Sequence, residues 1–212
     1  MTEREEIEEY LNGVHRGIVD LSDVNLSGFD LLSAAFSCAN LSGADLTSSN
    51  LTRADLTNAC LRNTILDNSK LYNADLSNAD LTEATLRDTN LSNAYLINTV
   101  LSNACLRDAK LVGALLIKSE LIETNLINAD LSNANLFKAD LTKANLSGAN
   151  LTGANLSKSI LKKTNLSGAN LQEANLSESD FIGANLTGVN LMEVELLNTD
   201  FSDANLTDAK LI

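Results

Sequence analysis

The sequence predicts an all-β solenoid, because three regularities run through most of its 212 residues. From Leu21 to Leu211, every fifth residue is Leu or Phe without a break. Two residues before each of them stands a mostly small residue, which is Ala in 23 of 39 cases. Asn or Asp usually stands directly before the Leu, and Ser or Thr directly after it. We number this five-residue unit so that the small residue is position 1 and the Leu is position 3, beginning at Val19.

A period of five fits neither regular helix nor flat strand. In a helix, successive Leu would be separated by roughly 500° and would wind round the whole surface. In a strand, an odd period would send alternate Leu to opposite faces. The pattern works if the chain turns a corner in every unit, so that each Leu points inward. Stacked coils of this kind form a solenoid, with Asn, Asp, Ser and Gly supplying the corners.

The repeating unit resembles that of the pentapeptide-repeat family. Examples are Ala139-Asp140-Leu141-Thr142-Lys143 and Ala149-Asn150-Leu151-Thr152-Gly153, and the resemblance covers about nine tenths of the chain. It implies a right-handed quadrilateral parallel β-helix with four units per coil. Residues 19–212 would then make about ten coils.

Residues 1–18 differ from the repeats and predict a short N-terminal capping α-helix with its connection. Thr2 and Glu5 form a capping-box pattern, and Gly13 is a stop signal. One apolar stripe follows helical spacing: Ile7, Tyr10, Leu11 and Val14. We therefore expect a helix that covers the first coil, followed by a repeat β-helix over 19–212. The alternative is an N-terminal helix that binds a partner.

The last repeats predict an uncovered coil. Lys210-Leu211-Ile212 is still in register, and an open coil end is an aggregation hazard. Either two molecules pair there, the final residues fray, or the natural chain is longer. Because some members of the resembling family dimerise through C-terminal ends, a homodimer through this coil is one expectation.

The N-terminus and the cysteines predict a cytoplasmic protein that does not enter membranes. Met1 to Glu6 is acidic and no apolar signal region follows it. No apolar run approaches the ~20 residues needed to span a bilayer. Cys38, Cys60 and Cys105 are odd in number and fall at outward positions, which is typical of a reducing compartment.

The sequence predicts no enzyme, no cofactor and no metal site. His15 is the only histidine, so neither a multi-histidine metal site nor a Ser-His-Asp triad recurs along the chain. The cysteines lack CxxC spacing, and no phosphate-binding glycine motif is present. Corner hydrogen bonding accounts for the many Asn and Asp residues.

The net charge of −13 argues against nucleic acid as a direct partner. It also bears on a function known in the resembling family, in which some members mimic DNA and bind type II topoisomerases. A rod of ten coils would be roughly 47 Å long, and duplex DNA of that length carries about 28 negative charges. The charge density here is far lower. A DNA-mimicking gyrase inhibitor or protector is therefore the alternative function.

Apolar residues interrupt the polar outward positions in the middle of the rod. At twenty residues per coil, five of them would stack on one face beside two lysines, and three more would carry an apolar belt round the other sides. The stacked set is Tyr95, Ile97, Leu115, Ile117 and Phe137 with Lys118 and Lys138, and the belt is Val112, Ile122 and Ile127. Contiguous exposed apolar surface usually marks an interaction site.

These observations predict a non-catalytic scaffold or regulator that binds another protein through a mid-rod face. The competing explanation of the same residues is neutral drift, because Ile, Val and Phe are good strand formers at tolerant surface positions.

Overall fold

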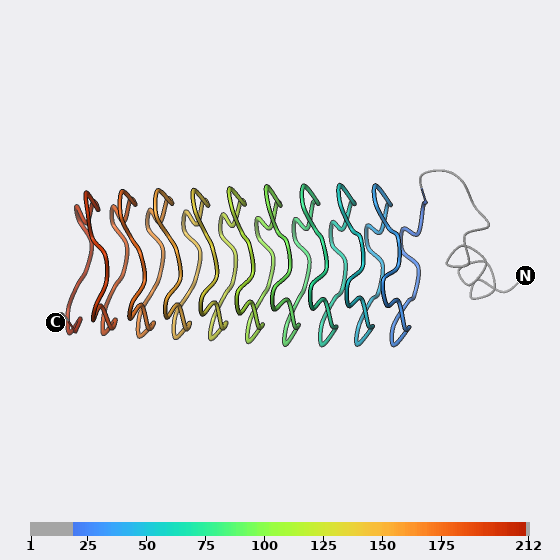
Figure 1. Cartoon of the computed structure of the whole chain (residues 1–212), viewed down its shortest axis with the longest axis horizontal. Coiled ribbons are helices and arrows are strands. Elements are labelled where there is room, and N and C mark those ends of the chain that lie inside the picture. The colour runs from blue at the N-terminus through green and yellow to red at the C-terminus, as the bar shows by residue number, and fades with distance from the viewer. Residues whose placement is uncertain (1–18, 211–212) are drawn as a thin grey trace, which may run out of the picture.

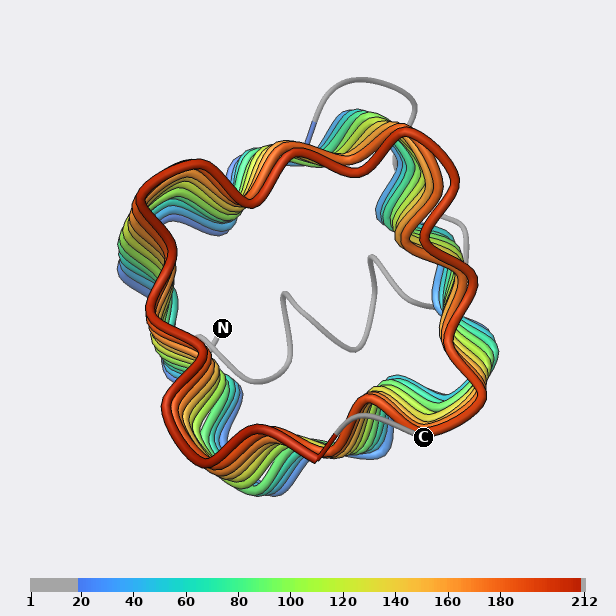
Figure 2. The same ribbon diagram turned by 90° about the vertical axis from the view of Figure 1, so that its left-hand side faces the viewer.

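Coils of twenty residues stack into a four-sided tube in the computed structural model, which describes residues 19–210 (Figure 1, Figure 2). Parallel bridges join each position-2 residue to its counterpart twenty residues later, from Asp20–Asn40 to Asn190–Lys210. The twenty-residue coil is therefore confirmed. These bridges are single residues, so the described chain contains no longer strand and no helix. None of it forms a helix long and apolar enough to cross a membrane. The helix predicted over 1–18 lies outside the described residues and stays a prediction.

The four walls of the tube follow one another around each coil. Wall 1 begins with residues 19–23, wall 2 with 24–28, wall 3 with 29–33 and wall 4 with 34–38. Every fourth unit returns to the same wall, and the end-on view shows the coils lying over one another (Figure 2). Outward side chains of one wall therefore form files that run along the tube.

The interior consists of the position-3 and position-1 side chains. Position 3 is essentially closed to solvent from Leu26 to Leu186. Position 1 is small because it also points inward, between the leucines. Where it is Thr, the hydroxyl donates to a backbone carbonyl of the preceding coil: Thr124 Oγ1 donates to the Leu101 carbonyl at 2.8 Å. A buried hydroxyl with such a partner avoids the cost of an unpaired polar group.

Backbone hydrogen bonds between coils run along the tube axis. On wall 4, Leu116 N donates to the Asn135 carbonyl at 2.8 Å and Lys118 N donates to the Phe137 carbonyl at 2.9 Å. In the other direction, Leu115 N donates to the Ala94 carbonyl at 3.0 Å. The same three bonds recur in nearly every unit, so each wall has a continuous ladder whose donors and acceptors are used within the tube.

Each corner is a tight turn with a left-handed residue. The position-1 amide of the next unit bonds the position-3 carbonyl, as in Ala134 N to Leu131 O at 3.0 Å. Every position-5 residue from Asp23 to Asp208 has φ between 55° and 70°. Gly and Asn suit this geometry, as the sequence predicts, but Lys, Glu and Arg also adopt it here, at a cost of about 1 kcal/mol each. The repetitive stack over-determines these corners.

Candidate protein-interaction surface

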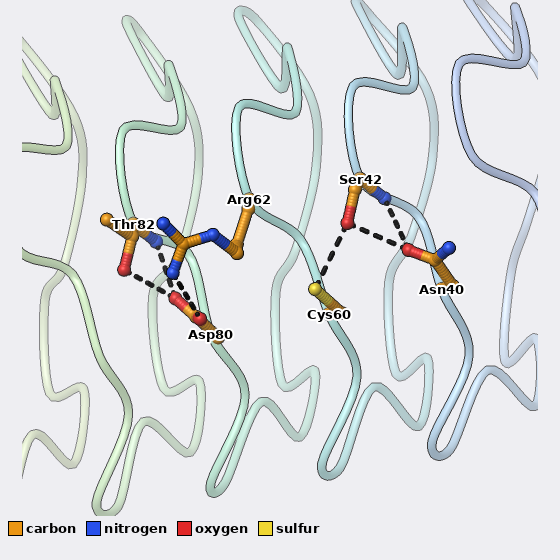
Figure 3. Close-up of polar contacts among 6 residues, drawn as sticks. All are labelled: Asn40, Ser42, Cys60, Arg62, Asp80 and Thr82. Atoms are coloured by element: carbon orange, nitrogen blue, oxygen red, sulfur yellow. Dashed lines mark hydrogen bonds and ion pairs between the residues drawn. The ribbon is translucent and has the colours of Figure 1, made fainter.

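Outward side chains on a wall contact the next coil in two ways, straight along the tube between residues twenty apart and diagonally between residues eighteen apart. The position-4 side chain of one coil lies beside the position-2 side chain of the next coil, eighteen residues later. Figure 3 shows this on wall 1, where Ser42 Oγ lies 3.0 Å from Cys60 Sγ and Arg62 Nη1 lies 3.0 Å from Asp80 Oδ2.

Wall 4 brings together the five stacked residues predicted from the sequence. Tyr95 and Leu115 form a parallel bridge. Asn98 N donates to the Ile117 carbonyl at 3.0 Å, and the Lys118–Phe137 bond continues the same file. We call Tyr95, Ile97, Leu115, Ile117 and Phe137 the wall-4 patch.

The wall-4 patch is partly open to solvent and is bounded by polar residues. The Tyr95 side chain is the most exposed, at 45%, whereas the other four are half-buried against one another. The file that precedes Tyr95 and Ile97 holds Asp75 and Ser77. Beyond Phe137, position 4 of the wall returns to Ser157 and Ser177. The patch therefore spans three coils, or about 10 Å along the axis.

The two lysines predicted beside the patch lie at the corner between wall 4 and wall 1. Lys118 and Lys138 are both exposed position-5 residues in consecutive coils. The Lys138 Nζ atom is 5.3 Å from the centroid of the Phe137 ring, within range of a cation–π interaction. Lys158 continues the same file in the next coil and is also exposed.

The three belt residues are not brought together with one another. Val112 lies on wall 3, Ile122 on wall 1 and Ile127 on wall 2, and each is half-buried. With Ile117 they make one circuit of the tube, so a single flat partner surface cannot contact all of them. Only the wall-4 patch forms a continuous apolar area among the predicted residues.

Other exposed apolar side chains were not predicted. Ile65 on wall 2, Tyr72 on wall 3 and Ile160 on wall 1 are 38–40% exposed. Each is isolated, as for Ile65, whose bridge partners are Asp45 and Thr85. Their signal in the sequence is a single apolar residue at position 2 or 4 with polar residues twenty positions away on either side. Isolated residues of this kind need no functional explanation.

Wall 1 is the most acidic wall, and its carboxylates are held by short hydrogen bonds (Figure 3). Asp80 Oδ1 accepts from the Thr82 amide at 2.9 Å and from the Thr82 hydroxyl at 2.5 Å. Burial pushes the pKa of Asp80 upward, but the hydrogen bonds from Thr82 and then Arg62 outweigh it and lower the pKa below its usual value. The same pairing raises the pKa of Arg62. These ionised groups stabilise the surface of the wall.

Side chains that could hold a metal do not gather within residues 19–210. No group of three or more His, Cys, Asp or Glu is placed to bind an ion in that part of the chain. Cys38, Cys60 and Cys105 are free thiols, the first exposed and the others half-buried.

The fold and its surface define a class of protein, a four-sided parallel β-helix built from five-residue units that offers only its outer walls and ends to other molecules. The family described as Pentapeptide repeats (8 copies) matches residues 19–53, 49–88, 79–116, 114–153, 134–172, 149–188 and 169–208. The chain belongs to the pentapeptide-repeat family.

One solved structure supports this membership, and a second shares the fold. The chain is similar to HetL, a pentapeptide repeat protein involved in heterocyst differentiation regulation from the cyanobacterium Nostoc sp. strain PCC 7120. The identity is 33%, the TM-score is 0.83, and the match covers 100% of this chain and 95% of HetL. Full-length QnrB1, a plasmid-mediated fluoroquinolone resistance protein, shares the fold with 19% identity, a TM-score of 0.54 and 92% coverage of each chain. These solved structures are right-handed β-helices, which is the handedness expected for this tube from the sequence. A search of curated proteins finds no match.

Proposed function

We propose that this protein is a non-catalytic scaffold or regulator that binds another protein through the wall-4 patch. The observation that carries the proposal is the three-coil file of apolar side chains on wall 4, bounded by Asp75 and Ser77 at one end and by Ser157 and Ser177 at the other. The similarity to HetL, whose described role is in regulation, supports a regulatory rather than a chemical role.

The wall-4 patch suits protein binding because most of its backbone is already paired. The inter-coil ladder uses the amides of positions 2, 3 and 5 in these units, which favours recognition of a partner by side chains. Aromatic and aliphatic anchors surrounded by polar residues are the usual centre of such an interface. The predicted cytoplasmic location, and a partner that is neither nucleic acid nor membrane, belong to the same proposal.

The test compares partner capture by two double variants. Ile117→Glu with Phe137→Glu should leave the protein folded, because both side chains point outward, and should abolish capture of the native partner from the host. Ile65→Glu with Ile160→Glu adds the same charge at isolated exposed positions and should retain capture. If the wall-4 variant unfolds, these side chains belong to the core; if it still captures the partner, the wall-4 patch is not the interface. Either result refutes the proposal.

The alternative, a DNA-mimicking topoisomerase regulator, would act through wall 1. That wall has the largest excess of acids, but bases are interspersed among them. The acids are Asp20, Asp23, Asp80, Glu83, Glu120, Glu123, Asp140, Asp180, Asp200 and Asp203, and the bases are Arg62, Lys143, Lys162 and Lys163. A gyrase supercoiling assay separates the two functions, since inhibition or protection at micromolar protein supports the mimic.

A homodimer through the last coil is a further part of the proposal. Leu196, Leu197 and Leu206 are 40%, 69% and 36% exposed there. A second copy that covered this coil would remove that apolar surface from water. The molar mass in solution tests it: a dimer is expected for the wild type and a monomer for Leu197→Glu.

A further inference from the structure

The two flanks of the wall-4 patch differ in charge. The corner that leads out of wall 4 carries Lys118, Lys138 and Lys158 in three consecutive coils. The corner that leads into it carries only uncharged residues, Asn93, Gly113 and Asn133. The wall-4 patch therefore has a cationic edge on one side and a neutral edge on the other, so a charged ligand can distinguish its two sides.

Two of these three lysines have no acidic partner among the described residues. Lys158 pairs with Glu178 at 3.3 Å, and Lys143 on the neighbouring wall pairs with Glu123 at 2.7 Å. Lys118 and Lys138 form no ion pair within residues 19–210. Two unpaired cations in adjacent coils, about 4.8 Å apart along the backbone, repel each other and would be stabilised by carboxylates.

The ladder already uses most of the wall-4 backbone, which disfavours strand addition as the mode of recognition at this surface. Leu96 N already donates to the Leu115 carbonyl at 2.8 Å, and Asn98 N to the Ile117 carbonyl at 3.0 Å. An α-helix needs no such pairing, because its own backbone is satisfied. A helix lying along the tube axis advances 5.4 Å per turn, close to the spacing of the coils. Its apolar stripe would follow the wall-4 patch, and side chains on one flank would follow the lysine file.

We propose that the occupant of wall 4 is an amphipathic helix of a partner protein whose apolar stripe is flanked on one side by a row of Asp or Glu. This inference rests on the proposed function and specifies the chemistry of its partner. Charge complementarity of this kind sets the orientation of the helix and its selectivity more than its total affinity. The local pattern runs against the protein as a whole, whose net charge of −13 attracts basic ligands.

The test uses two fluorescently labelled model helices in anisotropy titrations with the full chain. Both helices carry Leu at i, i+3, i+4 and i+7; one has Glu along one flank and the other has Lys at the same sites. The acidic helix should bind at least about tenfold more tightly, with an advantage that shrinks as salt is raised. Non-specific attraction to an acidic protein predicts the opposite order.

Matched charge variants show which lysines produce the preference for the acidic helix. Lys118→Glu with Lys138→Glu should remove the preference for the acidic helix. Lys70→Glu with Lys110→Glu makes the same change in net charge at exposed sites on wall 3 and should keep the preference. Equal loss in both variants would overturn the inference, because the effect would then be global.

The remaining outcomes separate this inference from the proposed function. Both helices could bind equally well, and Ile117→Glu with Phe137→Glu could abolish binding of both. The proposed acidic flank of the partner helix is then refuted, while the wall-4 patch remains the interface. If neither helix binds, or the basic helix binds more tightly, the inference is overturned. Capture of the native partner then decides the proposed function independently.

Discussion

The middle coils and the last coil contain the same five-residue unit but bury it differently. Leu116 and Leu136 in the middle are completely buried, whereas Leu196 and Leu206 in the last coil are 40% and 36% exposed. Leu186, whose amide donates to the Asn205 carbonyl of the next coil at 2.8 Å, is completely buried. The burial of a leucine therefore depends on the coil beyond it rather than on its own unit.

Other features are the same in both regions because they are complete within one unit. The corner residues Asn98 and Asn198, on the same wall, have φ of 55° and 56°. Asp200 in the last coil accepts from the Ser202 amide at 2.9 Å and its hydroxyl at 2.6 Å, as Asp80 does from Thr82. The comparison separates local interactions, which every unit carries alone, from those that require stacking.

The largest expected effect tests the stacking interactions directly. Leu116→Ala should lower the free energy of unfolding by about 2–5 kcal/mol, because it leaves a cavity between two coils. Leu206→Ala should cost about 1 kcal/mol or less, since its side chain is already partly in water. Urea unfolding of the two variants measures the difference. Equal losses would show that the last coil is covered in solution, as the dimer requires.

An intermediate effect tests the corners. Gly28→Ala and Gly168→Ala should each destabilise the protein by about 1 kcal/mol, because both glycines have φ near +68°. A Cβ atom at either glycine meets no atom within 4 Å, so the cost comes from the backbone alone. The two losses should agree within about 0.5 kcal/mol although one glycine is in the first coil. A much larger loss at Gly168 would mean that corners also depend on stacking.

The smallest expected effect concerns acid sensitivity. Hydrogen bonds from the Ser202 hydroxyl and then its amide lower the pKa of Asp200, and the bonds to Asp80 lower its pKa despite burial. Ionised Asp therefore favours folding above the unfolded pKa of about 3.9, and this contribution is lost as pH falls through the folded value. Asp80→Asn and Asp200→Asn should each reduce the loss of stability between about pH 6 and pH 3. Denaturant midpoints across this range provide the measurement; no change for Asp200→Asn would show that its hydrogen bonds do not hold in the last coil.

Much of the surface could be predicted because the period converts sequence distance into spatial distance. Once twenty residues make a coil, Tyr95 must lie beside Leu115, and Ile97, Ile117 and Phe137 must share a file. The placement of the belt residues follows in the same way: Val112, Ile122 and Ile127 are spaced by five or ten, which puts them on different walls, as the sequence predicts. The missing acid partners of Lys118 and Lys138 could not be predicted, since position-5 lysines pair in some coils and not in others.

The periodic spacing of leucine and small residues was sufficient to specify the inward columns, since only a tube with a corner in every unit buries every fifth side chain. Stacking decided the rest: which leucines are buried, that Lys, Glu and Arg are held in left-handed corners, and that wall 4 joins an apolar file to two lysines that form no ion pair within residues 19–210. The physical reason is that corner and carboxylate hydrogen bonds span two or three residues, whereas burial and lateral contacts join residues about twenty apart and exist only when neighbouring coils are in place.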